Sequence, residues 1–90
     1  MLVALMCHDK AGHLEVRKSN RDAHLAYIKQ TGVVTMAGPL LDADGQMCGS
    51  MIVLDVADMA AAQAWVDGDP YGKAGLFQSC VFKQWNKVIG

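Results

Sequence analysis

His24 and Asp69 are the two residues of this sequence whose types are best suited to moving a proton. A carboxylate that faces an imidazole fixes its tautomer and stabilises the imidazolium, as in general acid–base catalysis. About forty-five positions separate the two residues, so their spacing does not show that they meet. The fold has to bring them together.

Both residues also have structural interpretations that involve no chemistry. By position alone, His24 is more often a half-buried histidine whose ring is satisfied by a backbone carbonyl. Asp69 precedes Pro70, and this dipeptide is a good helix start, with the aspartate as N-cap and the proline at the first helical position. These interpretations stand beside the catalytic one.

Two arginines accompany His24 on one face of the first expected helix. Arg17 and Arg21 precede it by seven and three positions, and Leu25 and Ile28 continue the same face. We place His24 about one turn after the helix N-cap, where the helix dipole disfavours the charged imidazole and favours a neutral base. The two arginines act in the same direction, or they bind an anionic group of a substrate.

The remaining histidines do not form a recognisable metal site. His8 and His13 flank Asp9 in a polar stretch. Their spacing matches no common metal motif, and a surface loop is the simpler interpretation. We therefore predict neither a metal nor a cofactor.

Charge and cysteine content restrict the partners and the compartment. With 8 basic and 9 acidic residues and no run of either sign, the chain is not expected to bind nucleic acid. The apolar stretch Met1–Cys7 lacks a basic flank and is too short for a signal peptide or a membrane span, so we expect no leader and no membrane association. Cys7, Cys48 and Cys80 contain no C-x-x-C pair, which indicates free thiols packed in a cytoplasmic protein.

The pattern of apolar runs and turn residues predicts the order strand, helix, strand, strand, helix, strand. The first helix is expected to begin at a cap formed by Ser19 and Asn20 and to end at Gly32. Asp58 caps the second helix, and a short turn follows Pro70. The expected strands are Leu2–Cys7, which we expect to be buried on both faces, then Val33–Ala37, Gly49–Val56 and Ser79–Val88. This is the α+β, ferredoxin-like βαββαβ arrangement.

The chain is expected to form one domain, residues 1–90, that pairs with a second copy. A domain of this size buries only roughly 60–65% of the surface of its unfolded chain, yet 52% of the residues are apolar. In the strand Gly49–Val56, Ile52 and Leu54 share one face, and Met51 and Val53 share the other. Two helices cover only one face of a four-stranded sheet, so a partner chain is the simplest cover for the second. The alternative is that the apolar excess only reflects many alanines and methionines.

An ordered set of motifs along the whole chain resembles the YCII-related (YciI-like) proteins. The set consists of Arg17-x-x-x-Arg21-x-x-His24-Leu25-x-Tyr27-Ile28, Gly38-Pro39-Leu40, Gly45, Gly49-Ser50, Asp69-Pro70-Tyr71 and Ala74-Gly75-Leu76-Phe77. No single motif is specific, whereas the ordered set is fairly specific, especially His24 together with Asp69-Pro70-Tyr71. The loop Asp9–Gly12 departs from the family, which often has proline at the position of Ala11.

The resemblance implies a ferredoxin-like fold that pairs into a dimeric α/β barrel, with a His–Asp dyad, His24 and Asp69, at a pocket. It implies that Ser50, on a family motif position, orients a substrate. Arg17, Arg21 and Tyr71 also fall on pattern positions and are candidate substrate-binding residues. At least one type of member is a dehydrochlorinase that acts on a chlorinated hydroxylated ring.

The sequence thus predicts a small cofactor-free enzyme that uses the dyad for acid–base chemistry. The reaction would be an elimination, isomerisation or hydrolysis of a small polar, hydroxylated cyclic substrate. The alternative is a non-catalytic dimer that binds a small ligand or regulates a partner, because a fold does not by itself imply a function.

Overall fold

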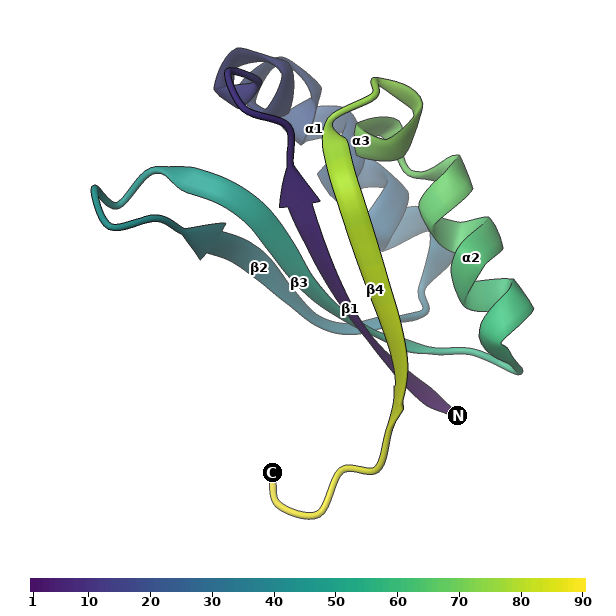
Figure 1. The fold of residues 1–90 in the computed structure, drawn as a ribbon. Coiled ribbons are helices and arrows are strands. Elements are labelled where there is room, and N and C mark those ends of the chain that lie inside the picture. The colour runs from purple at the N-terminus through teal and green to yellow at the C-terminus, as the bar shows by residue number, and fades with distance from the viewer.

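The structure, a computed structural model, describes all residues 1–90. Its elements follow the predicted order, with the turn after Asp69 forming a short third helix (Figure 1). The elements are β1 (Leu2–Asp9), α1 (Leu14–Thr31), β2 (Val34–Leu41), β3 (Met47–Asp55), α2 (Met59–Gly68), α3 (Pro70–Lys73) and β4 (Phe77–Trp85).

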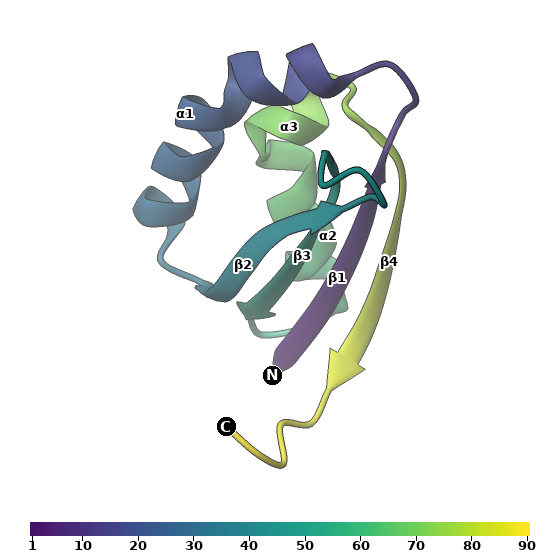
Figure 2. The same cartoon turned by 90° about the vertical axis from the view of Figure 1, so that its left-hand side faces the viewer.

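The four strands form one sheet in the order β2-β3-β1-β4, and every neighbouring pair is antiparallel. The first and third strands are therefore central, and the helices lie on one side of the sheet (Figures 1 and 2). This arrangement confirms the ferredoxin-like βαββαβ fold. It also leaves the other side of the sheet without a helix.

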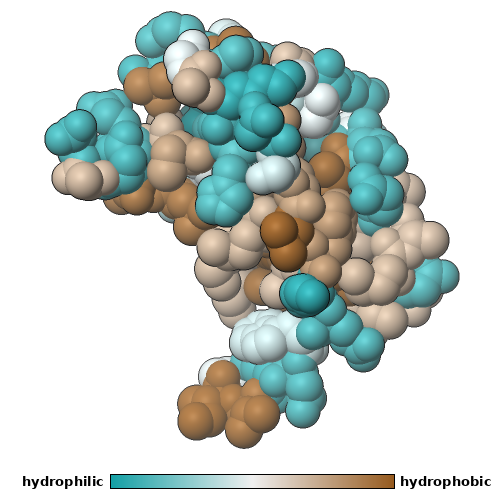
Figure 3. All heavy atoms as spheres, viewed as in Figure 1, coloured by the Kyte–Doolittle hydropathy of each residue, from teal (hydrophilic) through white to brown (hydrophobic).

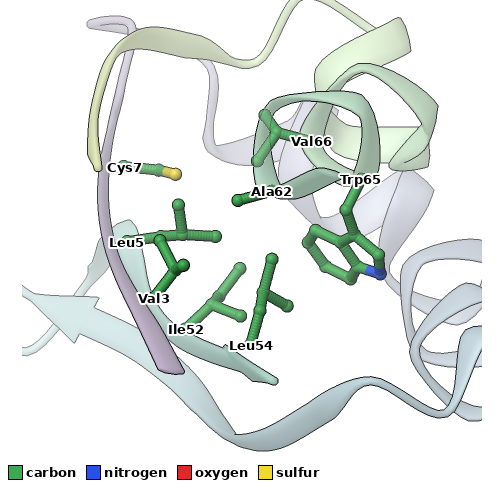
Figure 4. Packing of buried hydrophobic residues seen from close by; sticks show 8 residues of the cluster. All are labelled: Val3, Leu5, Cys7, Ile52, Leu54, Ala62, Trp65 and Val66. Atoms are coloured by element: carbon green, nitrogen blue, oxygen red, sulfur yellow. The ribbon is translucent and has the colours of Figure 1, made fainter. Parts of the chain in front are cut away.

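The core lies between the central strands and α2. Val3, Leu5 and Cys7 alternate along β1 and point to the helices, and side chains of β3 and α2 meet them (Figure 4). The other members of the cluster are Ile52, Leu54, Ala62, Trp65 and Val66. Burying each large apolar side chain contributes about 1.5–3 kcal/mol relative to leaving it in water. This packing fixes the distance between α2 and the sheet, and hence the position of Asp69 at the end of α2.

The opposite face of the sheet is apolar and open. Met6 lies directly across from Met51 on one neighbouring strand and from Val81 on the other, and the three side chains are 37%, 43% and 49% exposed. Figure 3 views this face, and tan and brown residues occupy its middle. The prediction of two apolar faces for β3 is confirmed. The expectation that β1 is buried on both faces is wrong for the single chain, because its second face carries the exposed Met6.

The predicted start of the first helix is wrong. The helix begins at Leu14, and the side chains of Ser19 and Asn20 lie inside it, where both bond to the carbonyl of Val16. Asparagine and serine can satisfy the backbone of a preceding turn as well as cap a helix, so their presence alone does not locate the start. His24 therefore lies roughly three turns into the helix, and the dipole effect, which falls off within the first turn, does not explain its chemistry.

The other predicted helix caps agree with the structure, whereas two strand ends differ: β2 continues through Gly38 and Pro39 to Leu41, and β4 ends at Trp85 and not at Val88. Gly32 ends α1 in a left-handed conformation with φ 66°. Asp58 caps α2 by accepting from the backbone N–H of Ala61, and Asp69 is the N-cap of α3 with proline at its start. The β2–β3 turn closes with a hydrogen bond from Gly45 N–H to the carbonyl of Asp42. None of the helices is long and apolar enough to cross a membrane.

Candidate functional site

His24 and Asp69 are in direct contact. The Nδ1 atom of His24 lies 2.7 Å from Oδ1 of Asp69, and the two residues are only 6% and 0% exposed. An ionised carboxylate only accepts hydrogen bonds, so the imidazole carries its proton on Nδ1 and its Nε2 is left for a ligand. The fold thus joins two residues that the sequence places far apart.

The helix cap and the dyad use the same oxygen of Asp69. Oδ1 also accepts from the backbone N–H of Tyr71 at 3.1 Å, which is the capping hydrogen bond of α3. The second oxygen, Oδ2, is buried and has no hydrogen-bond partner. A fully buried carboxylate needs compensation for lost hydration. Apart from one backbone N–H, that compensation comes from His24 alone.

Tyr71 is placed against the imidazole by the same short helix. Its ring stacks on that of His24 with centroids 3.9 Å apart and an interplanar angle of 14°. The guanidinium carbon of Arg17 lies 4.7 Å from the centroid of the Tyr71 ring. Burial raises the pKa of the Tyr71 phenol and outweighs the opposite influence of Arg17 and Arg21. The phenol is therefore protonated at neutral pH and is a hydrogen-bond donor.

Arg17 is fixed by an ion pair that the sequence analysis missed. Its Nε and one terminal nitrogen donate to the two carboxylate oxygens of Asp9 at 2.7 and 2.9 Å, and that terminal nitrogen also donates to Oγ of Ser50 at 2.9 Å. Burial opposes the charge of Arg17, but the bonds and charge of Asp9 raise the pKa of the guanidinium, which remains a cation.

The sequence favours a surface loop for Asp9, whereas the side chain of Asp9 is only 7% exposed in the structure. A signal for its true position was present in the sequence. Val3, Leu5, Cys7 and Asp9 alternate, and alternate residues of a strand face the same side. Asp9 therefore continues the inward-facing row of β1. A carboxylate at that place needs a cation, and Arg17 is the partner.

The predicted residues meet at one pocket of about 190 Å³ between α1, β2 and β3. Its walls include Arg17, Arg21, His24, Ser50 and Tyr71. The apolar part of the lining comes from Leu25, Ile28 and Met47, together with Ala37, Pro39 and Ile52. Asp69 does not line the pocket but lies behind His24, in contact with Nδ1.

The cysteines and the other histidines lie outside this pocket. Cys7 and Cys80 are opposite each other on β1 and β4, with sulfur atoms 2.7 Å apart. Burial raises the pKa of both thiols, which disfavours the reactive thiolate. The expectation of packed, free thiols agrees with these contacts. His13 contacts the carbonyl of Ala11 through Nδ1, and His8 is exposed on β1.

Comparison with known proteins gives matches over nearly the whole chain. The pattern of the YCII-related domain matches residues 1–86. Protein YciI of Escherichia coli O6:H1 is 36% identical, and the match covers 99% of this chain and 100% of that protein. An uncharacterized protein of Haemophilus influenzae is 29% identical, and the match again covers 99% of this chain and 100% of that protein.

Among solved structures, 5-chloro-2-hydroxyhydroquinone dehydrochlorinase (TftG) from Burkholderia phenoliruptrix AC1100, in complex with 2,5-dihydroxybenzoquinone, is 33% identical. It superposes with a TM-score of 0.88 over 96% of this chain and 94% of its own. An antibiotic biosynthesis monooxygenase matches with a TM-score of 0.61 over 99% of this chain and 100% of its own, but at 11% identity. That likeness shows a shared fold only.

Proposed function

This chain belongs to the family of YCII-related domains, and from that premise we propose that it is a small-molecule enzyme in which His24 and Asp69 form an acid–base dyad. The observation that carries the proposal is the buried contact of 2.7 Å between Nδ1 of His24 and Oδ1 of Asp69 at the wall of a pocket. Buried pairs of this kind in a concave site are the usual mark of proton-transfer chemistry.

In the proposed reaction, Nε2 of His24 takes a proton from the substrate. Asp69 stabilises the imidazolium that forms and keeps the proton of the resting ring on Nδ1, while Tyr71 holds the ring plane by stacking. Proton transfer by a placed side chain contributes typically 10²–10⁴-fold to the rate. Positioning of the substrate by the pocket has to supply the rest.

The size of the pocket favours a single substituted ring as the substrate. An apolar cavity of about 150 Å³ is large enough for benzene, and this pocket measures about 190 Å³. The dehydrochlorinase TftG, solved with 2,5-dihydroxybenzoquinone, suggests a hydroxylated ring. We assign substrate binding to Ser50, Arg21 and Tyr71, and assign Arg17 the task of holding Ser50 and Tyr71 in place. The reaction class is an elimination, isomerisation or hydrolysis that needs no cofactor.

We infer that two copies of the chain pair through the open face of the sheet. The exposed row formed by Met6, Met51 and Val81 supports this pairing, because monomers rarely leave contiguous apolar patches in water. The three free thiols support a place in the cytoplasm.

Chloride release from 5-chloro-2-hydroxyhydroquinone tests the enzymatic proposal. In this elimination of HCl, a base removes a proton and chloride departs with the bonding electrons. We expect wild-type protein to release chloride and His24→Gln to be slower by about 10²-fold or more, because the proton acceptor is lost. The matched control is His8→Gln, which removes an exposed imidazole outside the pocket and should leave the rate unchanged. An equal rate for wild type and His24→Gln would rule out His24 as the base.

A non-catalytic binding module is the alternative, and the capping bond from Tyr71 N–H to Asp69 is the observation in its favour. That bond gives Asp69 a structural role without any chemistry. It does not account for the position of His24. The ring of His24 lies at the wall of the pocket, and Asp69 contacts its Nδ1 atom and not its Nε2 atom.

A further inference from the structure

The charged side chains that line the pocket are not all paired. Arg17 is neutralised by Asp9, with nitrogen–oxygen distances of 2.7 and 2.9 Å. Asp69 is hydrogen-bonded to His24 at 2.7 Å and lies behind the ring, outside the pocket lining. Arg21 also lines the pocket, yet none of the ion pairs of the protein includes it. Its guanidinium is therefore the one full charge at this pocket that has no partner in the chain.

The other polar groups of the pocket are also arranged as donors. Ser50 Oγ accepts from Arg17, so its own hydroxyl proton is free to be donated. The phenol of Tyr71 keeps its proton, because its burial disfavours the phenolate. Apart from the hydroxyl lone pairs of Ser50 and Tyr71, Nε2 of His24 is the nitrogen or oxygen acceptor among the lining side chains. A neutral hydroxyl can accept hydrogen bonds from these donors, but an oxyanion also carries the charge that matches the unpaired guanidinium of Arg21, and charge-assisted hydrogen bonds are stronger.

We propose that the pocket selects an organic anion, a flat ring that carries an enolate, phenolate or carboxylate oxygen, and that Arg21 binds that oxygen. The inference deepens the proposed function by naming the substrate class, and it rests on that function only for the task of His24. The lining supports it, since Leu25, Ile28 and Ile52 offer apolar surface for the faces of a ring.

Arg21 and Arg17 therefore have different tasks, although both are arginines on one helix face. Both nitrogens that Arg17 uses are occupied by Asp9 and Ser50, and the residue is only 2% exposed. Arg21 is exposed and retains its full set of donors for a ligand. Replacing Arg21 should consequently change ligand selection without unfolding the protein.

The experiment compares pairs of ring probes of closely similar shape that differ in charge. Binding is measured by calorimetry on the full chain for benzoate against benzamide, and for 2,5-dihydroxybenzoquinone, an anion at neutral pH, against its neutral reduced form 1,2,4,5-tetrahydroxybenzene kept under anaerobic conditions. We expect wild type to prefer the anion in at least one pair. The benzoate pair tests a carboxylate as the bound oxyanion, and the quinone pair tests an enolate. Added salt should weaken the preference, because the guanidinium is exposed to screening.

Three variants assign the preference to Arg21. Arg21→Gln should weaken anion binding about 10–100-fold, the usual range for a charge-assisted hydrogen bond, and leave the neutral probe unchanged. Lys18→Gln removes an exposed cation of the same helix that pairs with Glu15 outside the pocket, and should keep the preference. His24→Gln separates the two proposals, since it should abolish turnover while anion binding to Arg21 persists.

Specific outcomes overturn the inference. Equal affinity of wild type for the charged and neutral probes of both pairs contradicts it, as does the absence of saturable anion binding below about 1 mM. A preference that survives in Arg21→Gln shows that another group binds the anion. If wild type prefers anions but releases no chloride, the inference stands and the acid–base function fails. Circular dichroism of each variant verifies that the fold is retained.

Discussion

At the scale of single residues, the site depends on one oxygen atom of Asp69 that serves two hydrogen bonds. Oδ1 accepts from the backbone of Tyr71 and from the ring of His24. The structural and the catalytic interpretations of Asp69 are therefore not exclusive. The capping bond holds the carboxylate where the imidazole can reach it, and a substitution that keeps the cap but removes the charge separates the two roles.

Asp69→Asn is that substitution, because asparagine is as good an N-cap as aspartate. A carboxylate that faces the imidazole stabilises the imidazolium that forms in proton transfer, so we expect Asp69→Asn to slow chloride release by about 10²-fold or more. The capping hydrogen bond is kept, so urea unfolding should show that the variant is still a folded protein. Asp58→Asn makes the same change at the exposed N-cap of α2 and should leave the rate unchanged. An Asp69→Asn protein as fast as wild type would mean that the carboxylate does not act on the ring.

At the scale of elements, the short helix α3 places Asp69 and Tyr71, and its shape depends on Gly72. A Cβ atom at this position would collide with the backbone carbonyl oxygen of Val66, at the end of α2. The clash involves the backbone and not a flexible side chain, so it is not relieved by a change of rotamer. The close packing of α3 on α2 thus requires glycine at position 72, because there is no space for a Cβ atom.

We expect Gly72→Ala to destabilise the protein by about 1–3 kcal/mol, the usual cost of forcing extra atoms into a packed region. Helix propensity alone predicts the opposite sign, a gain of up to about 1 kcal/mol for alanine. Urea unfolding decides between the two effects. Gly38→Ala is the comparison, because a Cβ atom there meets nothing within 4 Å. A Gly72→Ala protein as stable as wild type would show that α3 can shift away from α2.

At the scale of the whole molecule, the sheet has one face under helices and one face in water. The helix side contains the core cluster and the pocket, and the open side carries the row of Met6, Met51 and Val81. Chains of this size are marginal as monomers because they bury a small share of their surface. Pairing of two open faces would add burial without disturbing the pocket, which lies on the helix side.

Met51→Glu tests the pairing, because two copies of the charge would have to be buried in an apolar interface. We expect wild type to have the mass of a dimer or larger assembly in light scattering and Met51→Glu to have the mass of a monomer. Leu25→Glu is the matched control, since Leu25 is 44% exposed on the helix side and Met51 is 43% exposed on the sheet side. A monomeric wild type, or an assembly that survives Met51→Glu, would contradict pairing through this face.

The sequence by itself determined the order of elements, most of their ends and the fold class, because these follow from local causes. Short apolar runs bounded by turn residues indicated the strands, the left-handed Gly32 ended α1, and Asp58 and Asp69 began the next helices. It misplaced the start of α1 because Ser19 and Asn20 satisfy a backbone carbonyl inside a helix as readily as they cap one. The type and spacing of Arg17, Arg21 and His24 also placed them correctly on one helix face.

Only the tertiary structure decided which of these residues act together. The contact of His24 with Asp69 spans 45 positions, and it depends on how α2 and α3 pack against α1 and the sheet. Asp9 neutralises Arg17 and leaves Arg21 unpaired, although both arginines look alike in the sequence. Ion pairs and stacked rings join side chains of separate elements, and no local sequence pattern encodes how far apart those elements lie in the folded chain. The charge that is left over in the pocket, and hence the kind of ligand it selects, is therefore a property of the folded chain.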